Sequence, residues 1–69
     1  MITIVTARRL TDTDFLLGFE IRVLNSGRPI MRFWCRTMDM ALYRIAMLRD
    51  YFNRMGYKVV LIDIDRKIA

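Results

Sequence analysis

Two Asp-x-Asp pairs are the residues of this sequence whose type and spacing best suit chemistry. Asp12 and Asp14 stand in the polar stretch LTDTD, and Asp63 and Asp65 stand near the end of the chain in LIDID. Paired carboxylates can hold Mg²⁺ and support metal-dependent phosphoryl transfer, provided that the fold brings the two pairs together. The simpler interpretation makes Asp12 and Asp14 turn formers, with the charges of both pairs neutralised by neighbouring basic residues. Because the pattern is weak and the domain small, we expect no enzymatic activity.

The two residue types most often used in nucleophilic and metal chemistry are nearly missing. The sequence contains no histidine, and Cys35 is its single cysteine. Without histidine there is no usual general base, no Ser/His or Cys/His pair and no histidine-containing zinc site. A single cysteine also excludes a cysteine-only zinc site and an internal disulfide, and it suits a reducing compartment. We therefore expect no cofactor, no bound metal and no small-molecule substrate, with Cys35 as a small core residue in a cytoplasmic protein.

The stretch MRFWCR, residues 31–36, points instead to a binding surface. Successive side chains of a strand point to opposite faces of the sheet. Every second residue of this stretch would then face the core, whereas Trp34 would share the opposite face with Arg32 and Arg36. Trp and Arg dominate the residues that carry binding energy in protein interfaces. This face is therefore a candidate contact.

The net charge narrows the choice of partner. The chain has a formal charge of +5, and ten of its twelve basic residues are arginine. Arginine suits bidentate contacts to phosphate and carboxylate groups better than lysine does. A polyanion or an acidic protein surface is the expected partner, and charge alone does not choose between them.

Composition indicates one folded domain over residues 1–69. Hydrophobic residues make up 55% of the chain, which favours a compact fold over disorder. The longest apolar run is far short of a membrane span, so we expect no membrane association. At the N-terminus the charged residues follow the apolar ones, which is the wrong order for a secretory signal. No linker, repeat or low-complexity tract is present, and we expect a complete short reading frame.

Hydrophobic patterning predicts the elements that position these residues. Alternating apolar residues predict strands over 2–8, 15–24 and 30–36, separated by turns at 10–14 and 25–29. In the second strand the apolar side chains on the expected core face are Phe15, Leu17, Phe19, Ile21 and Val23.

The pairing of the second and third strands follows from which residues must be buried. A two-residue loop, Ser26-Gly27, would place Trp34 on the core face, whereas a three-residue loop of residues 26–28 buries a consistent apolar set. We therefore expect the longer loop. It places Arg22 directly opposite Arg32, an unfavourable pair that Glu20 offsets only in part. The expected pairs are Phe19–Cys35, Glu20–Trp34, Ile21–Phe33, Arg22–Arg32, Val23–Met31 and Leu24–Ile30.

A helix is predicted from Thr37, as the N-cap, to about Met55, where Gly56 ends it. The helix has two apolar faces. The stripe expected to face the sheet is Ala41, Leu42, Ile45, Leu48, Phe52 and Met55. The opposite stripe consists of Met40, Tyr43, Met47 and Tyr51, flanked by Arg44 and Arg54.

The last strand lies within YKVVLIDIDRK and is apolar on both sides. We expect Val60, Ile62 and Ile64 on the core side, with Val59 and Leu61 on the other. A right-handed crossover through the helix would lay this strand parallel to the first. The predicted fold is α+β, a single β-β-β-α-β domain with one helix packed on a mainly antiparallel four-stranded sheet of order 3-2-1-4.

One helix can cover only one face of such a sheet, so the second face is left for a contact. Exposed apolar patches of this kind usually mark interaction sites. The side chains expected there are Val5, Leu16, Leu24, Ile30, Trp34, Val59 and Leu61, with Arg22, Arg32 and Arg36 among them.

The sequence thus favours a non-enzymatic binding protein. We expect it to inhibit or modulate a larger protein or nucleoprotein complex by occupying one of its surfaces, in the style of small phage or mobile-element regulators. A homodimer is also expected, and the sequence leaves open which surface makes the self-contact. The sheet contact would use Arg22, Arg32, Trp34 and Arg36; the helix contact would use Met40, Tyr43, Arg44, Met47, Tyr51 and Arg54.

The alternative is direct binding of DNA or RNA through Trp34 and its flanking arginines. Sheets can lie in a major groove or stack bases on aromatic side chains. The arm-binding domains of phage-type integrases use a three-stranded sheet backed by a helix in this way. The closely spaced aromatics and glycines typical of RNA-binding sheets are absent here.

Overall fold

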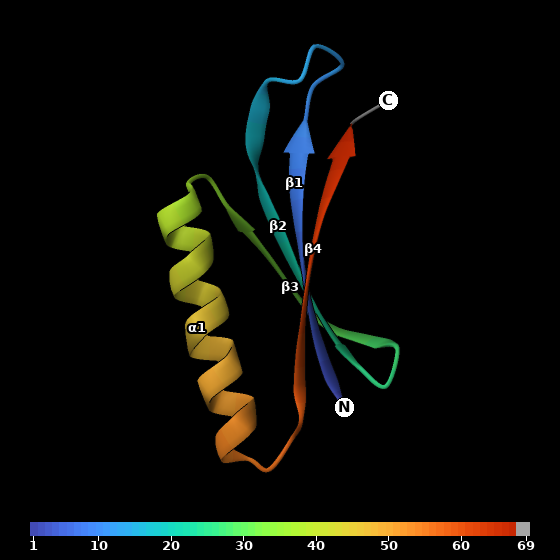
Figure 1. The fold of residues 1–69 in the computed structure, drawn as a ribbon, viewed down its shortest axis with the longest axis vertical. Helices are drawn as coiled ribbons and strands as arrows, with labels where there is room; N and C mark the ends of the chain where they lie inside the picture. The colour runs from blue at the N-terminus through green and yellow to red at the C-terminus, as the bar shows by residue number, and fades with distance from the viewer. Residues whose placement is uncertain (68–69) are drawn as a thin grey trace.

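The protein forms a small α+β domain, which confirms the predicted fold class. The structure, a computed structural model, describes residues 1–67. The single helix of this part packs against one face of the sheet and leaves the other face uncovered (Figure 1). The elements are β1 (Ile2–Leu10), β2 (Leu16–Asn25), β3 (Arg28–Cys35), α1 (Met38–Arg54) and β4 (Val59–Lys67).

The strands form one sheet in the order β3-β2-β1-β4, as predicted. β2 pairs antiparallel with β1 and β3, whereas β4 pairs parallel with β1. β3 and β4 run in the same direction, so a tight turn cannot join them, and α1 supplies the crossover from one to the other. β3 and β4 are consequently the two edges of the sheet.

The hairpin of β2 and β3 has the predicted register from Phe19–Cys35 to Val23–Met31, whereas the predicted pair Leu24–Ile30 and the predicted three-residue loop are wrong. Ile21 pairs with Phe33 and Val23 with Met31, but the turn contains only Ser26 and Gly27, with φ of 50° and 84°. Positive φ at both turn positions is typical of the type I′ turn, whose twist matches that of a hairpin. The extra residue is absorbed further along as a β-bulge, because Leu24 pairs with Pro29 and Ile30 is left over.

The core lies between the sheet and α1. Cys35 belongs to it, as expected of a small apolar side chain. Phe33, Ile45 and Val59 are partly buried against this core. Its buried members are Ile2, Ile4, Phe19, Ile21, Val23, Cys35, Ala41, Leu48 and Phe52.

The helix begins and ends where the sequence predicts. The Thr37 hydroxyl accepts a hydrogen bond from the Met40 amide at 3.2 Å, and Gly56 follows the helix with a φ of 88°. The predicted inner stripe is only partly correct. Leu42 and Met55 are each 56% exposed, because Leu42 lies at the margin of the stripe and Met55 is the C-cap residue beyond the last turn.

The prediction for β4 has the two sides exchanged. Ile2 pairs with Val59 and Ile4 with Leu61, and both isoleucines are buried under α1. Val59 and Leu61 therefore face the helix, whereas Val60, Ile62 and Ile64 lie on the uncovered face. Alternation could not decide this, because both sides of β4 are apolar and the loop after α1 sets which side faces inward.

The far end of the β1–β2 hairpin projects beyond the helix, as Figure 1 shows. Phe15, predicted in the core, is 70% exposed and precedes β2, and Leu17 is also exposed. The 17-residue helix, at about 1.5 Å per residue, spans roughly 26 Å of a molecule 41 Å long. The helix is therefore too short to cover the hairpin tip. Within that tip, the Thr11 hydroxyl accepts a hydrogen bond from the Phe15 amide at 3.0 Å.

Candidate functional site

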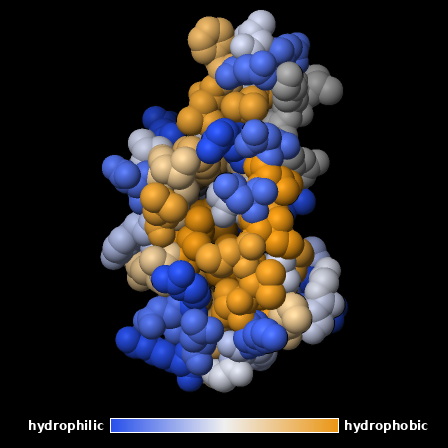
Figure 2. Space-filling model, in the orientation of Figure 1, coloured by the Kyte–Doolittle hydropathy of each residue, from blue (hydrophilic) through white to orange (hydrophobic). Residues whose placement is uncertain are grey.

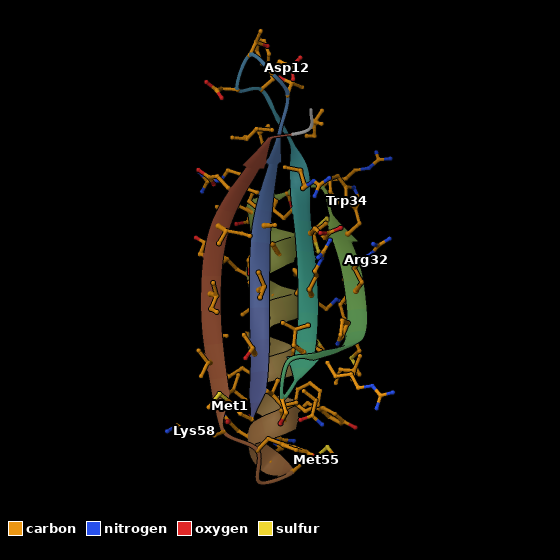
Figure 3. The ribbon with its side chains drawn as sticks, turned by 90° about the vertical axis from the view of Figure 1, so that its right-hand side faces the viewer. Met1, Asp12, Arg32, Trp34, Met55 and Lys58 are labelled. Carbon is orange, nitrogen blue, oxygen red and sulfur yellow. The ribbon has the colours of Figure 1, made fainter. Side chains whose placement is uncertain are left out.

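The uncovered side of the sheet, here called the open face, is the principal candidate surface. Figure 3 views it directly, with α1 behind the sheet and β4 and β3 at the two edges. The strand registers place a polar half on β2 and β3 and an apolar half on β1 and β4. The side chains that define the open face are Val5, Arg9, Glu20, Arg22, Arg32, Trp34, Val60, Ile62 and Ile64.

Trp34 lies against the backbone of Gly18 on the open face. A Cβ placed on Gly18 would lie 2.5 Å from Cζ2 of the indole and 2.9 Å from the carbonyl oxygen of Cys35. Such close approach requires glycine, because any side chain would displace the ring. A glycine covered by an aromatic ring from the neighbouring strand is a known device in sheets. The indole is thus held in place while 52% of the residue remains exposed.

Glu20 organises the arginines around Trp34. Its carboxylate accepts a hydrogen bond from Nε of Arg22 at 2.9 Å, and its oxygens lie 3.8 Å from Arg9 and 3.9 Å from Arg32. The side chain of Glu20 is only 13% exposed. Arg22 and Arg32 face each other directly across β2 and β3, as predicted, and the carboxylate between them relieves their repulsion. Glu20 therefore holds three guanidinium groups beside one indole.

The structure brings together most of the predicted sheet site. Arg22, Arg32 and Trp34 share the open face, as their alternation predicts. Arg36 is exposed but lies beyond the end of β3, in the bend that leads to α1. Arg9 joins the site from β1, which sequence reasoning missed, because only the pairing of β1 with β2 places it opposite Gly18.

The apolar half of the open face comes from β1 and β4. Ile62 and Ile64 are exposed, and Val5 and Val60 are half-buried beside them. The prediction had assigned this place to Val59 and Leu61, so the chemistry of the patch is as expected and its members differ. A contiguous aliphatic surface next to Trp and Arg has the composition of a protein interface.

The outer face of α1 is a second exposed surface. Met40, Tyr43, Met47 and Tyr51 are all exposed there. The guanidinium of Arg54 pairs with Asp50 at 3.1 Å, and both side chains are largely exposed. Predicted to flank this stripe, Arg44 instead lies over the ring of Phe33, with its guanidinium carbon 4.6 Å from the ring centroid. That cation–π contact directs Arg44 toward β3 and away from the outer stripe.

The acidic pairs do not form a metal centre in the described part of the chain. Residues 1–67 contain no group of three or more Asp, Glu, His or Cys side chains placed to hold a metal ion. Asp65 lies 3.8 Å from Arg8, which agrees with neutralisation by a basic neighbour. Asp14 has a φ of 66° in the β1–β2 turn, a conformation that Asp tolerates. This agrees with the turn-forming interpretation.

A groove between α1 and β4 was not foreseen. It has a volume of about 200 Å³ and opens along the β4 edge of the molecule. The sequence indicated such a groove only through the surplus of apolar residues on both α1 and β4. Because the two faces of β4 were assigned the wrong way round, Leu61 was not expected to face the helix. The groove, called the α1–β4 groove below, is lined by Thr6, Phe19, Met38, Ala41, Leu42, Ile45, Leu61, Ile62 and Asp63.

Comparisons add no functional information to these surfaces. No protein-family model, curated protein or solved structure gives a match to this chain. Within the described residues, no helix combines the length and the apolar character needed to cross a membrane. The functional argument therefore depends on the geometry of the surfaces themselves.

Proposed function

We propose that this is a non-enzymatic binding protein that regulates or inhibits a larger protein or nucleoprotein complex by covering part of its surface with the open face. The observation that carries the proposal is the placement of Trp34. Its indole is half exposed, yet it is held against Gly18 and shares its face of the sheet with three arginines that lie near Glu20. A large aromatic ring in a fixed position loses little conformational entropy on binding, which is characteristic of binding hot spots.

Charge and hydropathy on the open face favour a protein partner. Glu20 offsets part of the charge of Arg9, Arg22 and Arg32. The aliphatic half, with Ile62 and Ile64, offers nothing to a phosphate backbone but fits an apolar protein surface. A protein patch with an apolar centre and a carboxylate rim would complement both halves.

The proposal is tested with purified protein and a matched pair of variants. The immobilised chain captures its partner from a host lysate treated with nuclease, and the affinity for the identified, purified partner is then measured. Trp34→Ala should weaken binding by roughly 30-fold or more, the loss typical of a hot-spot residue. Phe15→Ala removes a more exposed aromatic ring at the hairpin tip and should leave the affinity unchanged. Equal affinity of Trp34→Ala and the parent protein would refute the proposal.

Direct nucleic-acid binding is the second candidate. This function is favoured by the position of Asp63. Asp63 pairs with Thr6 on the helix side of the sheet and therefore adds no negative charge to the open face. If this function is correct, affinity for duplex or single strands falls steeply with salt. Arg32→Ala would then reduce the slope of that dependence by about one. Failure of any nucleic acid to bind at low salt would eliminate this candidate.

A further inference from the structure

The two edges of the sheet differ in how they are protected. An edge strand presents unpaired backbone N–H and C=O groups, and proteins usually block such an edge against pairing with other chains. β3 has this protection. Pro29 lacks an N–H, the bulge at Ile30 interrupts the strand, and Arg28 and Arg32 add exposed charge.

β4 is less protected, because its charged residues, among them Asp63 and Asp65, all lie in its second half and residues 59–62 carry no charge. It pairs with β1 without a bulge from Val59 to Lys67, and it contains no proline. Among residues 1–67, no strand pairs with its outer backbone edge and no element covers that side in Figure 3. Leu61, Ile62 and Ile64 are all exposed, and isoleucine strongly favours strands. β4 is therefore a regular strand with apolar side chains on both faces and one unused side.

The surface beside this edge is apolar as well. Figure 2 shows a hydrophobic area over α1 and β4 that is largest in the lower half of the view and is interrupted by hydrophilic residues higher up. The α1–β4 groove lies here, and Leu42 and Leu61 at its margin are 56% and 48% exposed. Pairing at the backbone edge would therefore bury the apolar surface next to it.

We propose that β4 pairs antiparallel with β4 of a second copy of this chain, around a two-fold axis perpendicular to the sheet. The two sheets then form one continuous sheet with both helices on the same side, and the two grooves meet across the axis. The unused N–H and C=O groups of each β4 are satisfied by the other. A two-fold interface of this kind is self-complementary by construction.

The acidic residues of β4 select the register. The symmetry requires one residue to lie opposite its own copy. A pairing centred on Asp63 places the two copies of that carboxylate opposite each other. A pairing centred on Ile64 places Asp63 of each copy opposite Asp65 of the other. Both arrangements are unfavourable, because like charges are directly opposed. Centring on Ile62 pairs residues 59–65 of both copies and is the longest register without opposed carboxylates. It places Leu61 opposite Asp63 of the partner subunit.

This dimer goes beyond the proposed function and is compatible with it. In the register centred on Ile62, the aliphatic halves of the two open faces join into one surface around the axis. The Trp34 sites lie toward the two outer edges, on the same side of the sheet. The dimer would therefore present two copies of the binding site to a partner, which raises avidity when both can engage.

Light scattering tests the dimer through a matched pair of lysine variants. The parent protein should have twice the chain mass of 8.3 kDa. Ile62→Lys places a charge at the axis and should give the mass of one chain, whereas Leu17→Lys, at a similarly exposed position of β2, should remain dimeric. A monomeric parent protein overturns the proposal. So does an Ile62→Lys variant that stays dimeric, since the self-contact would then lie elsewhere.

Disulfide trapping tests the register and does not depend on the lysine variants. In a Cys35→Ala background, Ile62→Cys should crosslink to its own copy under mild oxidation, because directly opposed residues lie within disulfide range. Asp65→Cys should not crosslink, because its two copies would be about 20 Å apart along the strands. The opposite pattern overturns the register. Partner binding is measured through Trp34 and self-association through Ile62, so the two proposals fail separately.

Discussion

Replacing Gly18 with alanine tests whether the indole of Trp34 packs against Gly18 on the open face. The new Cβ would lie 2.5 Å from the indole and 2.9 Å from the carbonyl oxygen of Cys35. Ordinary carbon contacts are about 3.5–4.0 Å, so the ring must move by about an ångström while the backbone oxygen cannot give way. Overpacking of this size costs about 1–3 kcal/mol, and the reduced freedom of the unfolded chain returns up to about 1 kcal/mol. We expect a net loss of about 1–2 kcal/mol.

Two measurements read out this substitution. For a domain of this size, each kcal/mol lowers the Tm by about 4–8 °C, so calorimetry should show a drop of roughly 4–16 °C. Trp34 is the only tryptophan of the chain, and its fluorescence reports its position directly. The emission of the folded variant should shift to the red, and acrylamide should quench it more efficiently.

Gly27→Ala is the matched control for this experiment. Gly27 has a φ of 84°, and a Cβ there would meet nothing within 4 Å. Alanine is therefore strained by the backbone conformation alone, and we expect lower stability with unchanged tryptophan emission. If Gly18→Ala left both Tm and emission as in the parent protein, the indole would not be seated on Gly18, and the argument for a preorganised hot spot would be wrong.

Three further predictions concern the open face and the helix. Glu20→Gln should lower the free energy of unfolding by about 1 kcal/mol at low salt, and by less at high salt, because the repulsion among the arginines is then screened. Asp50→Asn breaks an exposed pair with Arg54 and should change stability by less than about 0.5 kcal/mol, which urea unfolding at two salt concentrations would show. Thr37→Ala removes the N-cap and should cost about 1 kcal/mol; an unchanged urea midpoint would contradict the capping contact.

The hairpin of β2 and β3 shows how far sequence reasoning reaches. The requirement to bury Ile21 with Phe33 was enough to predict the register and to place Arg22, Arg32 and Trp34 on one face. It was not enough to predict the turn, because a tight type I′ turn followed by a bulge at Ile30 produces the same register as a longer loop. The pattern of buried residues therefore determines the register of the two strands but not the conformation of the turn that joins them.

β4 shows the opposite case. Val59, Val60, Leu61 and Ile62 are all apolar, so alternation carries no information about which side faces the helix. The assignment depends on how the chain leaves α1, a matter of three-dimensional geometry. The α1–β4 groove and the uncovered edge of β4 could not be predicted until this assignment was known.

Within the site, the packing of Trp34 on Gly18 could have been predicted from the sequence. Gly18 interrupts an otherwise apolar and charged strand, and glycine inside a strand often marks a close approach by a neighbouring group. The role of Glu20 was visible only in outline. Its partial offset of the Arg22–Arg32 pair was predicted, whereas its contact with Arg9 requires the pairing of β1 with β2.

The most direct test of the central claim, that the open face is a binding surface anchored by Trp34, uses the protein labelled with fluorotryptophan. Its one tryptophan gives one ¹⁹F resonance, whose response to acrylamide and to solvent isotope reports exposure. Adding the purified partner should shift and broaden this resonance and remove its sensitivity to solvent. A resonance that stays unchanged and solvent-exposed at saturating partner would contradict the claim.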